Sequence, residues 1–478
     1  MGNTYWLVIG NPSPHGGGEK HVYETLKHYS ELGVLPILYV PFSDLIMSIF
    51  LDEANRNNMT EKSLQDLERS NVIIPNIIHD AIDHIRDNLA SYLEQFMKKG
   101  LAWAYYRMKR SLEYKRLNLM HARSFLKNLL SEDRDVVNRI EVVYSAHEIS
   151  SNLLVGSFLA RSLRKELYVL LQLEPFTPLQ KVIVDDWHYR VTIYKENSVK
   201  ELIRIALLTL QTTLEGTKSI YHRAIKERVL RGLLSVSASP LTASGLDALS
   251  SKMGIPVKII KPSNAVPNEL AKYSEYNERI RLLRKKEDFA VYFARLNSRK
   301  GLLEIPMIAK KLERHGYSTI VIGRFDRLTD KKAFFKKLED LNVKSLKYVG
   351  WLPAKDLQNI VSRAKVLVYP SHLDSFSLVV LEALFLGCSV IAYDIPAITS
   401  VYTSLKPVKI VREYDIKAMS EEAIRSLKKP AREHIEEHTD EHFMKFLKMH
   451  SSWKNVTEAE INAIREIRSD RCQFALDA

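Results

Sequence analysis

The most constraining feature of the sequence is the alternation of short, β-branched apolar runs with helical segments. The runs are YWLVIG, LPILYV, IEVVYSAH and ELYVLLQLE in the first half, and FAVYFARL, STIVIGRF, SLKYVGWL, KVLVYPS, SVIAYD and PVKIVR in the second. Strands that are apolar throughout and separated by helices are typical of parallel sheets covered on both faces. The two series therefore predict an α/β protein with two Rossmann-like, doubly wound domains.

The 478 residues are more than one ordinary core accommodates. Prolines interrupt the pattern at IPVKIIKPSNAVPNEL, residues 255–270. We therefore predict a first domain over 1–262, a second domain over 263–430, and closing helices over 431–478.

A long segment between the second and third apolar runs, residues 44–135, is predicted to be a helical insertion, because one crossover needs far fewer residues. Two sets of apolar residues recur there at helical spacing. The first set is Ile78, Ile82, Ile85, Leu89, Leu93 and Phe96, and the second is Leu101, Tyr105, Met108, Leu112, Leu119 and Leu126.

The formal net charge of +13 implies anionic partners: nucleotides, nucleic acid or an anionic membrane surface. Within residues 95–128, nine Lys and Arg face one acid, Glu113, and aromatic residues are interleaved. Such a helix can lie on an anionic bilayer, or it can be a solvated basic face of its own domain. Nucleic-acid binding is less supported, because no arginine-rich arm, zinc spacing or RNA-binding signature accompanies the charge.

The cysteines and the apolar segments suggest the cellular compartment of the protein. Two cysteines form neither a disulfide framework nor a metal cluster, which fits a reducing compartment. The longest apolar window, 376–393, has Glu382 near its centre and a break at Gly387, which argues against a membrane span. No charged leader begins the chain and the myristoylation pattern fails. We expect a cytoplasmic protein that attaches peripherally to the inner face of the membrane.

Ligands of open α/β sheets bind beyond the carboxyl ends of the strands, where two loops of the first domain stand out. The loop NPSPHGGGEKHV has three glycines, Gly16 to Gly18, that let the backbone approach an anion or a sugar. Alternatively, the three glycines only form a tight turn. His147 ends the run VVYSAHEI and suits a sugar hydroxyl or phosphate oxygen, or it is a core histidine bonded to backbone.

Two further loops belong to the second domain. Arg295 and Lys300 flank the turn in YFARLNSRKG, where two cations can neutralise a diphosphate without a metal; the alternative is solvated surface charge. In YPSHLDSFSLVVLEALFLG, we predict a helix over 375–387, with Asp374 at its start and Glu382 within it. The two carboxylates would be ~12 Å apart on a helix, a separation that suits a nucleotide-sugar.

These segments together resemble the retaining glycosyltransferases of family four, which have the GT-B fold of two domains facing a cleft. DSFSLVVLEAL is similar to the E-x7-E segment of that family, and ARLNSRKG to its G-R-L-x-x-x-K-G loop. GGGEKHV, SAHE, SVSASP, KPSNAVP and VGWLPAKDL follow in the expected order, and SSWKNVTEAEI resembles its closing W-x-x-V helix. The similarity spans most of the chain apart from the insertion.

The resemblance implies a role for each matched position. Arg295 and Lys300 would bind the donor diphosphate, Glu382 the ribose and Asp374 the transferred sugar. His147 would line the sugar site, and Gly17 and Gly18 would face donor and acceptor. Further donor-binding positions are Ser375, Phe376, Ser377, Leu378, Gly323 and Trp351.

Several positions depart from the pattern of that family. Asp374 replaces the usual Glu, a shorter reach, and Ser375 and Ser377 replace two glycines. Gln172 and Glu174 occupy the segment where the family has His-Asp.

The resemblance implies a retaining hexosyltransferase that uses a UDP- or GDP-linked sugar, with no cofactor and no metal. The acceptor would be lipid-linked or another saccharide. The alternative is a non-catalytic relative that only binds nucleotide-sugars.

Overall fold

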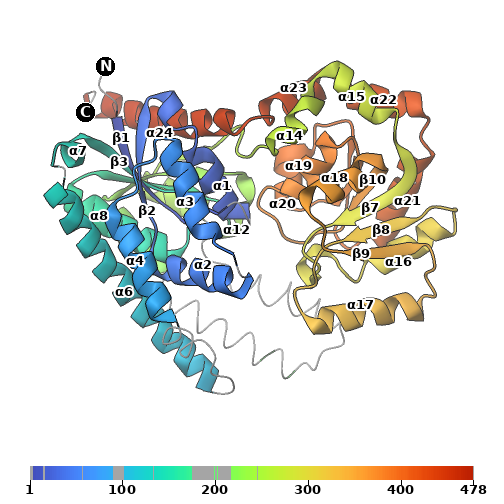
Figure 1. Ribbon diagram of the computed structural model, residues 1–478. Coiled ribbons are helices and arrows are strands. Elements are labelled where there is room, and N and C mark those ends of the chain that lie inside the picture. The colour runs from blue at the N-terminus through green and yellow to red at the C-terminus, as the bar shows by residue number, and fades with distance from the viewer. Residues whose placement is uncertain are drawn as a thin grey trace.

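The computed structural model describes residues 4–13, 17–55, 57–89, 102–132, 134–174, 199, 202, 217–244 and 246–476. Two six-stranded sheets organise the chain, and every pair of neighbouring strands is parallel. Helices cover the sheets, which form the cores of two separate lobes (Figure 1). This architecture confirms the predicted fold class.

The first sheet has the strand order β2-β1-β3-β4-β5-β6. Its strands are β1 (Thr4–Ile9), β2 (Val34–Tyr39), β3 (Ile140–Ser145), β4 (Glu166–Leu171), β5 (Leu230–Ser235) and β6 (Val257–Ile259). Because the chain leaves β1 toward β2 and returns on the other side at β3, the order reverses between β1 and β3. The carboxyl ends of these two strands are therefore where a ligand is expected.

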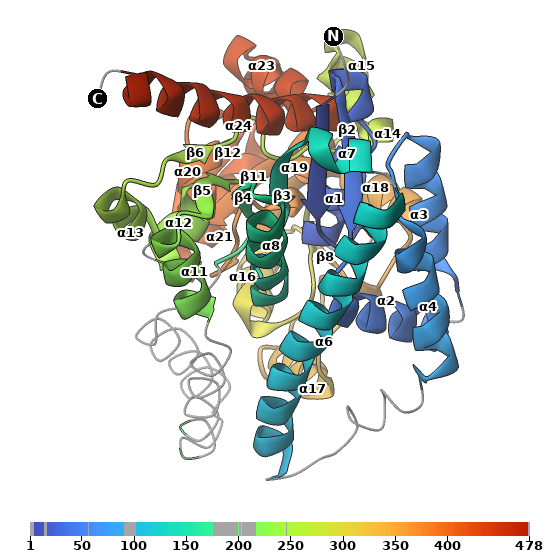
Figure 2. The same cartoon turned by 90° about the vertical axis from the view of Figure 1, so that its left-hand side faces the viewer.

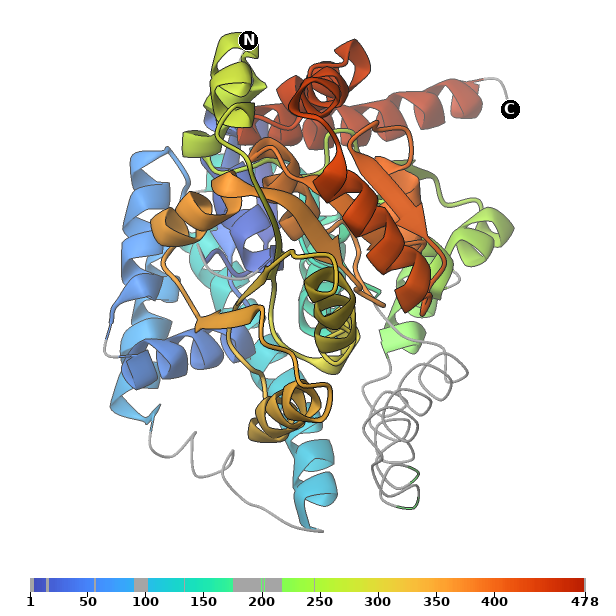
Figure 3. The same ribbon diagram turned by 90° about the vertical axis from the view of Figure 1, so that its right-hand side faces the viewer.

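The second sheet has the order β12-β11-β10-β7-β8-β9. Its strands are β7 (Glu287–Phe293), β8 (Thr319–Ile322), β9 (Leu346–Gly350), β10 (Ala364–Tyr369), β11 (Ser389–Tyr393) and β12 (Val408–Val411). Here the order reverses between β7 and β10, so their carboxyl ends form the corresponding edge. Figure 3 shows this lobe with its helices on both faces of the sheet.

Most of the described residues in the long connection between β2 and β3 are helical. The helices are α2 (Phe42–Asn55), α3 (Met59–Arg69), α4 (Asn76–Asp87), α6 (Ala102–Glu132) and α7 (Arg134–Arg139). Ile78, Ile82 and Ile85 are buried, as the helical spacing predicts. Leu93, Phe96 and Leu101, with the basic residues Lys98 and Lys99, lie outside the described residues.

The described part of the first lobe also contains α1 (Gly17–Leu26), α8 (Ser150–Leu163), α11 (Thr217–Lys226), α12 (Ala238–Ser244) and α13 (Leu246–Met253). The second lobe contains α14 (Asn268–Ala271), α15 (Tyr276–Leu283), α16 (Ile305–Glu313), α17 (Leu328–Asp340), α18 (Ala354–Arg363), α19 (Leu378–Phe385), α20 (Pro396–Tyr402) and α21 (Ile416–Lys428). Short 3₁₀ helices are η1 (Ser30–Leu32), η4 (Lys272–Ser274) and η5 (Ser298–Lys300).

Three helices close the chain: α22 (Ala431–His438), α23 (Glu441–Met449) and α24 (Trp453–Leu476). The last packs on α1 and β5 of the first lobe, and Figure 2 shows it running along that lobe. The first sheet ends at Ile259 and the second begins at Glu287, so the predicted join at 262/263 lies between them. Of the helices in the described part of the chain, none combines the length and the apolarity that crossing a membrane requires.

Candidate active site

The loop after β7 carries Arg295 and Lys300. Asn297 stabilises the turn, because its side-chain oxygen accepts a hydrogen bond of 3.1 Å from the backbone N–H of Lys300. Gly301 has φ +70°, and a Cβ there would lie 2.0 Å from the carbonyl oxygen of Pro370. Only glycine permits this approach, so the loop after β7 lies directly against the loop after β10.

Lys300 and Asp374 form an ion pair between these two loops. The Lys300 Nζ lies 2.8 Å from Asp374 Oδ2 and also donates to the carbonyl oxygen of Leu373 at 3.0 Å. The Tyr369 hydroxyl donates to the same Asp374 oxygen. Burial, together with that carboxylate, holds the pKa of Tyr369 well above its ordinary value. The structure thus brings Lys300 and Asp374 into contact, whereas the Arg295 side chain is exposed.

The helix that carries Glu382 is shorter than predicted. It begins at Leu378 and ends at Phe385, so the expectation of a helix from Ser375 to Gly387 was wrong at both ends. Ser377, the residue before the helix, has φ +70°, a left-handed conformation that starts α19 sharply at Leu378. The Phe376 side chain is buried against Tyr402 and His450, so only the backbone of Phe376 is available to a sugar donor.

Glu382 is half-buried within α19. Burial raises the pKa of this carboxyl, and Lys20 of α1 partly opposes the shift. Because Lys20 belongs to the first lobe, Glu382 lies within electrostatic reach of the boundary between the lobes. Its assignment to the ribose stays a prediction.

In the first lobe, His147 lies at the carboxyl end of β3 against the glycine loop. A Cβ on Gly18 would lie 2.6 Å from His147 Nε2, so a larger residue at this position would displace the His147 ring. The Gln172 side chain donates to the carbonyl oxygens of Gly18 at 3.3 Å and Ala146 at 2.7 Å. Gly17 begins α1 directly before this contact. Gln172, at the place of the family His-Asp, therefore ties the two loops together.

Carboxylates surround His147. Its Nδ1 lies 3.2 Å from Glu148 Oε1. Burial by itself would lower the pKa of His147, but Glu148, Glu19 and Asp44 together raise it above its ordinary value. Burial also raises the pKa of Asp44 to about 6. The carboxyl edge of the first sheet is therefore polar and acidic, whereas the matching edge of the second carries Arg295 and Lys300.

Gly323 and Trp351 follow β8 and β9. Gly323 has φ +146°, and a Cβ there would lie 2.0 Å from the carbonyl oxygen of Ala294. It therefore allows the loop after β8 to close on the loop of Arg295. Trp351 is 65% exposed, so its side chain is accessible to a ligand.

His372 was missed by the sequence analysis, although it lies two residues before Asp374. Its Nδ1 lies 2.7 Å from Glu413 Oε1 and its Nε2 lies 3.2 Å from Glu304 Oε1. Burial would lower the pKa of His372, but the two carboxylates raise it to about 9. Both partners are distant in sequence, so no local pattern indicates the interaction.

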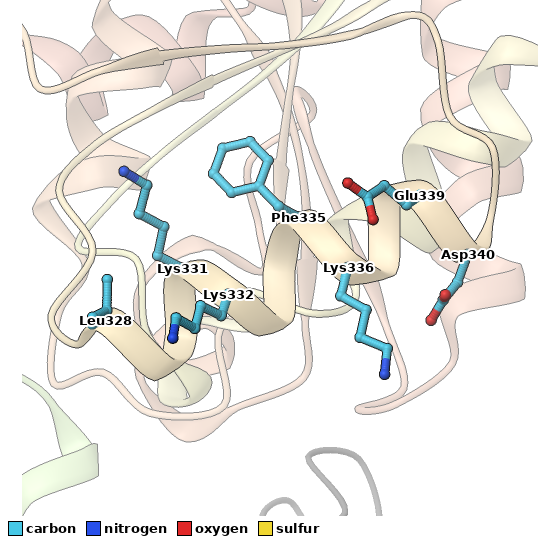
Figure 4. A pocket seen from close by; sticks show the side chains of 7 residues that line it. All are labelled: Leu328, Lys331, Lys332, Phe335, Lys336, Glu339 and Asp340. Atoms are coloured by element: carbon cyan, nitrogen blue, oxygen red, sulfur yellow. The ribbon is translucent and has the colours of Figure 1, made fainter.

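Within the described ranges, no group of three or more His, Cys, Asp or Glu is arranged to hold a metal ion. The expected independence of a metal stays a prediction. A hollow on the surface of α17 is lined by Leu328, Lys331, Lys332, Phe335, Lys336, Glu339 and Asp340 (Figure 4). All seven belong to one helix, so this hollow is separate from the site formed by the strand-end loops.

Comparisons with known proteins agree with this geometry. The family model described as "Glycosyl transferases group 1" matches residues 274–442, which include Arg295, Lys300, Asp374 and Glu382. No curated protein sequence matches the chain.

Solved structures share the fold over nearly the whole length. HepE of Anabaena, in complex with UDP and glucose, has a TM-score of 0.57 at 11% identity and covers 97% of this chain and 100% of its own. The sucrose-phosphate synthase of Thermosynechococcus elongatus has a TM-score of 0.58 at 11% identity, with coverages of 98% and 100%. The N-terminal domain of the trehalose-6-phosphate phosphatase of Candida albicans reaches 0.60 at 11% identity, with 97% of both chains covered. The chain thus has the GT-B fold, and its residues 274–442 match the model of the glycosyl transferases group 1.

Proposed function

We propose that the chain is a retaining hexosyltransferase that takes its sugar from a nucleotide diphosphate donor. The contact between Lys300 and Asp374 is the observation that carries this proposal. This contact brings a cation and a carboxylate together at the carboxyl ends of β7 and β10, shortly before the start of α19, and we assign the carboxylate to the transferred sugar. The free amide groups at that helix start favour an anion.

In this reaction the bond between the anomeric carbon and the diphosphate breaks, and negative charge develops on the departing phosphate oxygen. Lys300, Arg295 and the first amides of α19 would stabilise that charge. Lys300 and Tyr369 already engage Asp374, which favours a role in orienting sugar hydroxyls over nucleophilic attack. The acceptor hydroxyl would attack the anomeric carbon on the face that the diphosphate leaves and pass its proton to the departing phosphate oxygen. Attack on that face would retain the anomeric configuration.

For the donor, a UDP-linked hexose is the first choice, because the crystal structure of HepE contains UDP and glucose. GDP-linked sugars remain the second choice.

The acceptor would bind at the carboxyl edge of the first sheet, where hydroxyl groups can meet His147 and Asp44. A lipid-linked acceptor is supported by α2, which lies on the side of the first lobe that faces the second (Figure 1). Met47 and Leu51, one turn apart on α2, are 42% and 52% exposed. Exposed apolar side chains beside a polar cluster suit a saccharide that carries a hydrocarbon chain.

A Lys300→Met variant tests this proposal. Losing the cation should lower turnover by about 10²-fold or more, because the developing charge would lack its nearest partner. Lys310→Met is the matched control, since Lys310 pairs with Glu313 in the same domain but outside the site. Release of nucleoside diphosphate at the wild-type rate in Lys300→Met, with normal release in the control, would contradict the role of Lys300.

The alternative, a protein that binds nucleotide-sugars without turnover, is supported by the replacement of the usual Glu by Asp374. Calorimetry with UDP and GDP followed by a donor-hydrolysis assay separates the two. Binding without release of nucleoside diphosphate would favour the alternative.

A further inference from the structure

The loop between β10 and α19, residues 370–377, is held mainly by side chains. The Leu373 carbonyl accepts from Lys300 Nζ at 3.0 Å and from Ser371 Oγ at 3.1 Å. The Ser377 carbonyl accepts from the Tyr402 hydroxyl at 3.0 Å. These donors all belong to the second lobe, as does Tyr369, which together with Lys300 binds the Asp374 side chain. The backbone carbonyl groups of Asp374 and Ser375 lie between these contacts.

Two serines of the first lobe bind these two carbonyl groups. Ser239 Oγ donates to the carbonyl oxygen of Asp374 at 3.0 Å, and Ser237 Oγ donates to the carbonyl oxygen of Ser375. Both serines are buried, with exposed fractions of 1% for Ser237 and 2% for Ser239. Two consecutive peptide groups of the loop are therefore fixed from across the boundary between the lobes.

The serines are themselves rigidly placed. They follow the carboxyl end of β5, and Ser239 lies in the first turn of α12. The Ser237 hydroxyl accepts from the backbone N–H of Ser239 at 3.1 Å, and the Ser237 carbonyl accepts from Ser235 Oγ at 2.7 Å. Because α12 also packs on α20, the serines approach the loop as part of a wider contact between the lobes.

We propose that Ser237 and Ser239 are positioning residues that hold the donor-binding loop in place when the two lobes come together. The effect of these serines on catalysis rests on the proposed function, because that function assigns Asp374 to the transferred sugar. A carbonyl and the following N–H point in opposite directions across a planar peptide. Fixing the carbonyls of Asp374 and Ser375 therefore also fixes the N–H groups of Ser375 and Phe376, which precede Ser377 and the start of α19. Contact with the first lobe would thus order the loop that is proposed to bind the donor.

The test compares a Ser237→Ala/Ser239→Ala variant with the wild type by hydrogen exchange of the ligand-free protein. Loss of both hydroxyls should accelerate exchange in a peptide covering residues 371–386 by about tenfold, since local opening sets the exchange rate. Peptides from β7 and β10 should exchange at the wild-type rate. Ser420→Ala is the control, because Ser420 is equally buried but donates within α21, to the carbonyl of Ile416.

Unchanged exchange over residues 371–386 in the double variant would overturn the proposal, as would equal acceleration in Ser420→Ala. If the double variant does not fold, each single serine variant should show a smaller acceleration of exchange in the same peptide. Wild-type exchange in both single variants would then overturn the proposal. The exchange result does not depend on turnover. An accelerated loop in a protein that binds no nucleotide-sugar would therefore sustain the positioning role while rejecting the proposed function.

Where turnover is measurable, the double variant should lose about tenfold in kcat/KM for the donor while Ser420→Ala keeps the wild-type value. A wild-type kcat/KM in a double variant whose loop exchanges faster would overturn the catalytic consequence.

Discussion

At the scale of single residues, Ser377 has a backbone conformation that glycine tolerates better. Its φ of +70° lies in the left-handed region, which costs a residue with a side chain about 1 kcal/mol or more. Ser377→Gly should raise the free energy of unfolding by ~0.5 kcal/mol. The backbone strain that glycine removes from the folded state exceeds the conformational entropy that it adds to the unfolded chain. Chemical denaturation measures this change.

Ser420→Gly is the matched control for that substitution. Ser420 lies inside α21, where glycine costs about 1 kcal/mol relative to good helix formers. The two substitutions should therefore shift stability in opposite directions. An equal loss of stability in both would contradict the account of Ser377.

His372 predicts a pH dependence of stability. Its pKa rises from 6.5 to about 9 in the folded protein, so folding favours the protonated form. The stabilisation is fully present below pH 6.5 and is lost as the pH rises through about 9. His372→Gln should therefore cost ~3 kcal/mol more at pH 6 than at pH 10.

Denaturant unfolding at several pH values measures the difference between wild type and His372→Gln. The exposed His222 on α11 supplies the control, for which His222→Gln should change stability little at any pH. A cost of His372→Gln that does not vary with pH would contradict the bridging of Glu304 and Glu413.

Residue-scale features differ in how far they could be predicted. Lys300 and Asp374 could be found because each follows an apolar strand in a recognisable motif. Ser237, Ser239 and His372 could not, since their partners come from distant segments and a serine or histidine has many local explanations. The start of α19 was misplaced because Phe376 continues the apolar pattern of the helix toward its N-terminus, whereas the left-handed backbone of Ser377 prevents the helix from starting before Leu378.

At the scale of elements, α24 is attached to the first lobe by a buried polar cluster. Glu460 contacts His21 of α1 and accepts from the Tyr29 hydroxyl at 3.2 Å. Trp453 packs edge-on against the His21 ring, with centroids 5.4 Å apart. His21 also lies 3.4 Å from the side-chain oxygen of Asn264, in the connection between the sheets.

Glu460→Leu should lower the free energy of unfolding by about 3 kcal/mol, because His21 and Tyr29 would lose a buried acceptor. Adding His21→Leu should recover part of that loss, since the unpaired polar ring is removed as well. Urea denaturation of both variants measures the two changes. A double variant no more stable than Glu460→Leu alone would contradict the pairing.

The elements themselves were predicted well where apolar strands are continuous, because two-sided burial demands such runs. The closing helix was expected from SSWKNVTEAEI, and the structure adds its partner. His21 could not be recognised as that partner, because it lies 439 residues from Glu460.

At the scale of the whole molecule, the positive charge predicts peripheral attachment to an anionic membrane through α6. Lys115, Arg116, Arg123 and Lys127 lie in the described part of this helix. Changing all four to Glu should reduce sedimentation with phosphatidylglycerol vesicles by about 100-fold or more, since each cation near such a surface contributes ~1 kcal/mol.

The control for this prediction changes Lys331, Lys332, Lys336 and Lys337 of α17 to Glu, the same change of charge on the second lobe (Figure 4 shows three of them). The control should sediment like the wild type. An equal loss of sedimentation in both variants would indicate that net charge alone drives association with the vesicles. Unchanged sedimentation of the α6 variant would contradict membrane attachment and would indicate that the basic face of α6 is simply solvated.

This two-lobed chain is proposed to transfer a sugar from a nucleotide diphosphate sugar to an acceptor. The most direct measurement is release of nucleoside diphosphate, followed by phosphorus NMR, from a panel of UDP-, GDP- and ADP-linked hexoses. We predict release from at least one donor, with UDP-glucose first, and loss of that release in Lys300→Met. No release from any donor by a folded protein that binds the nucleotide would contradict the claim.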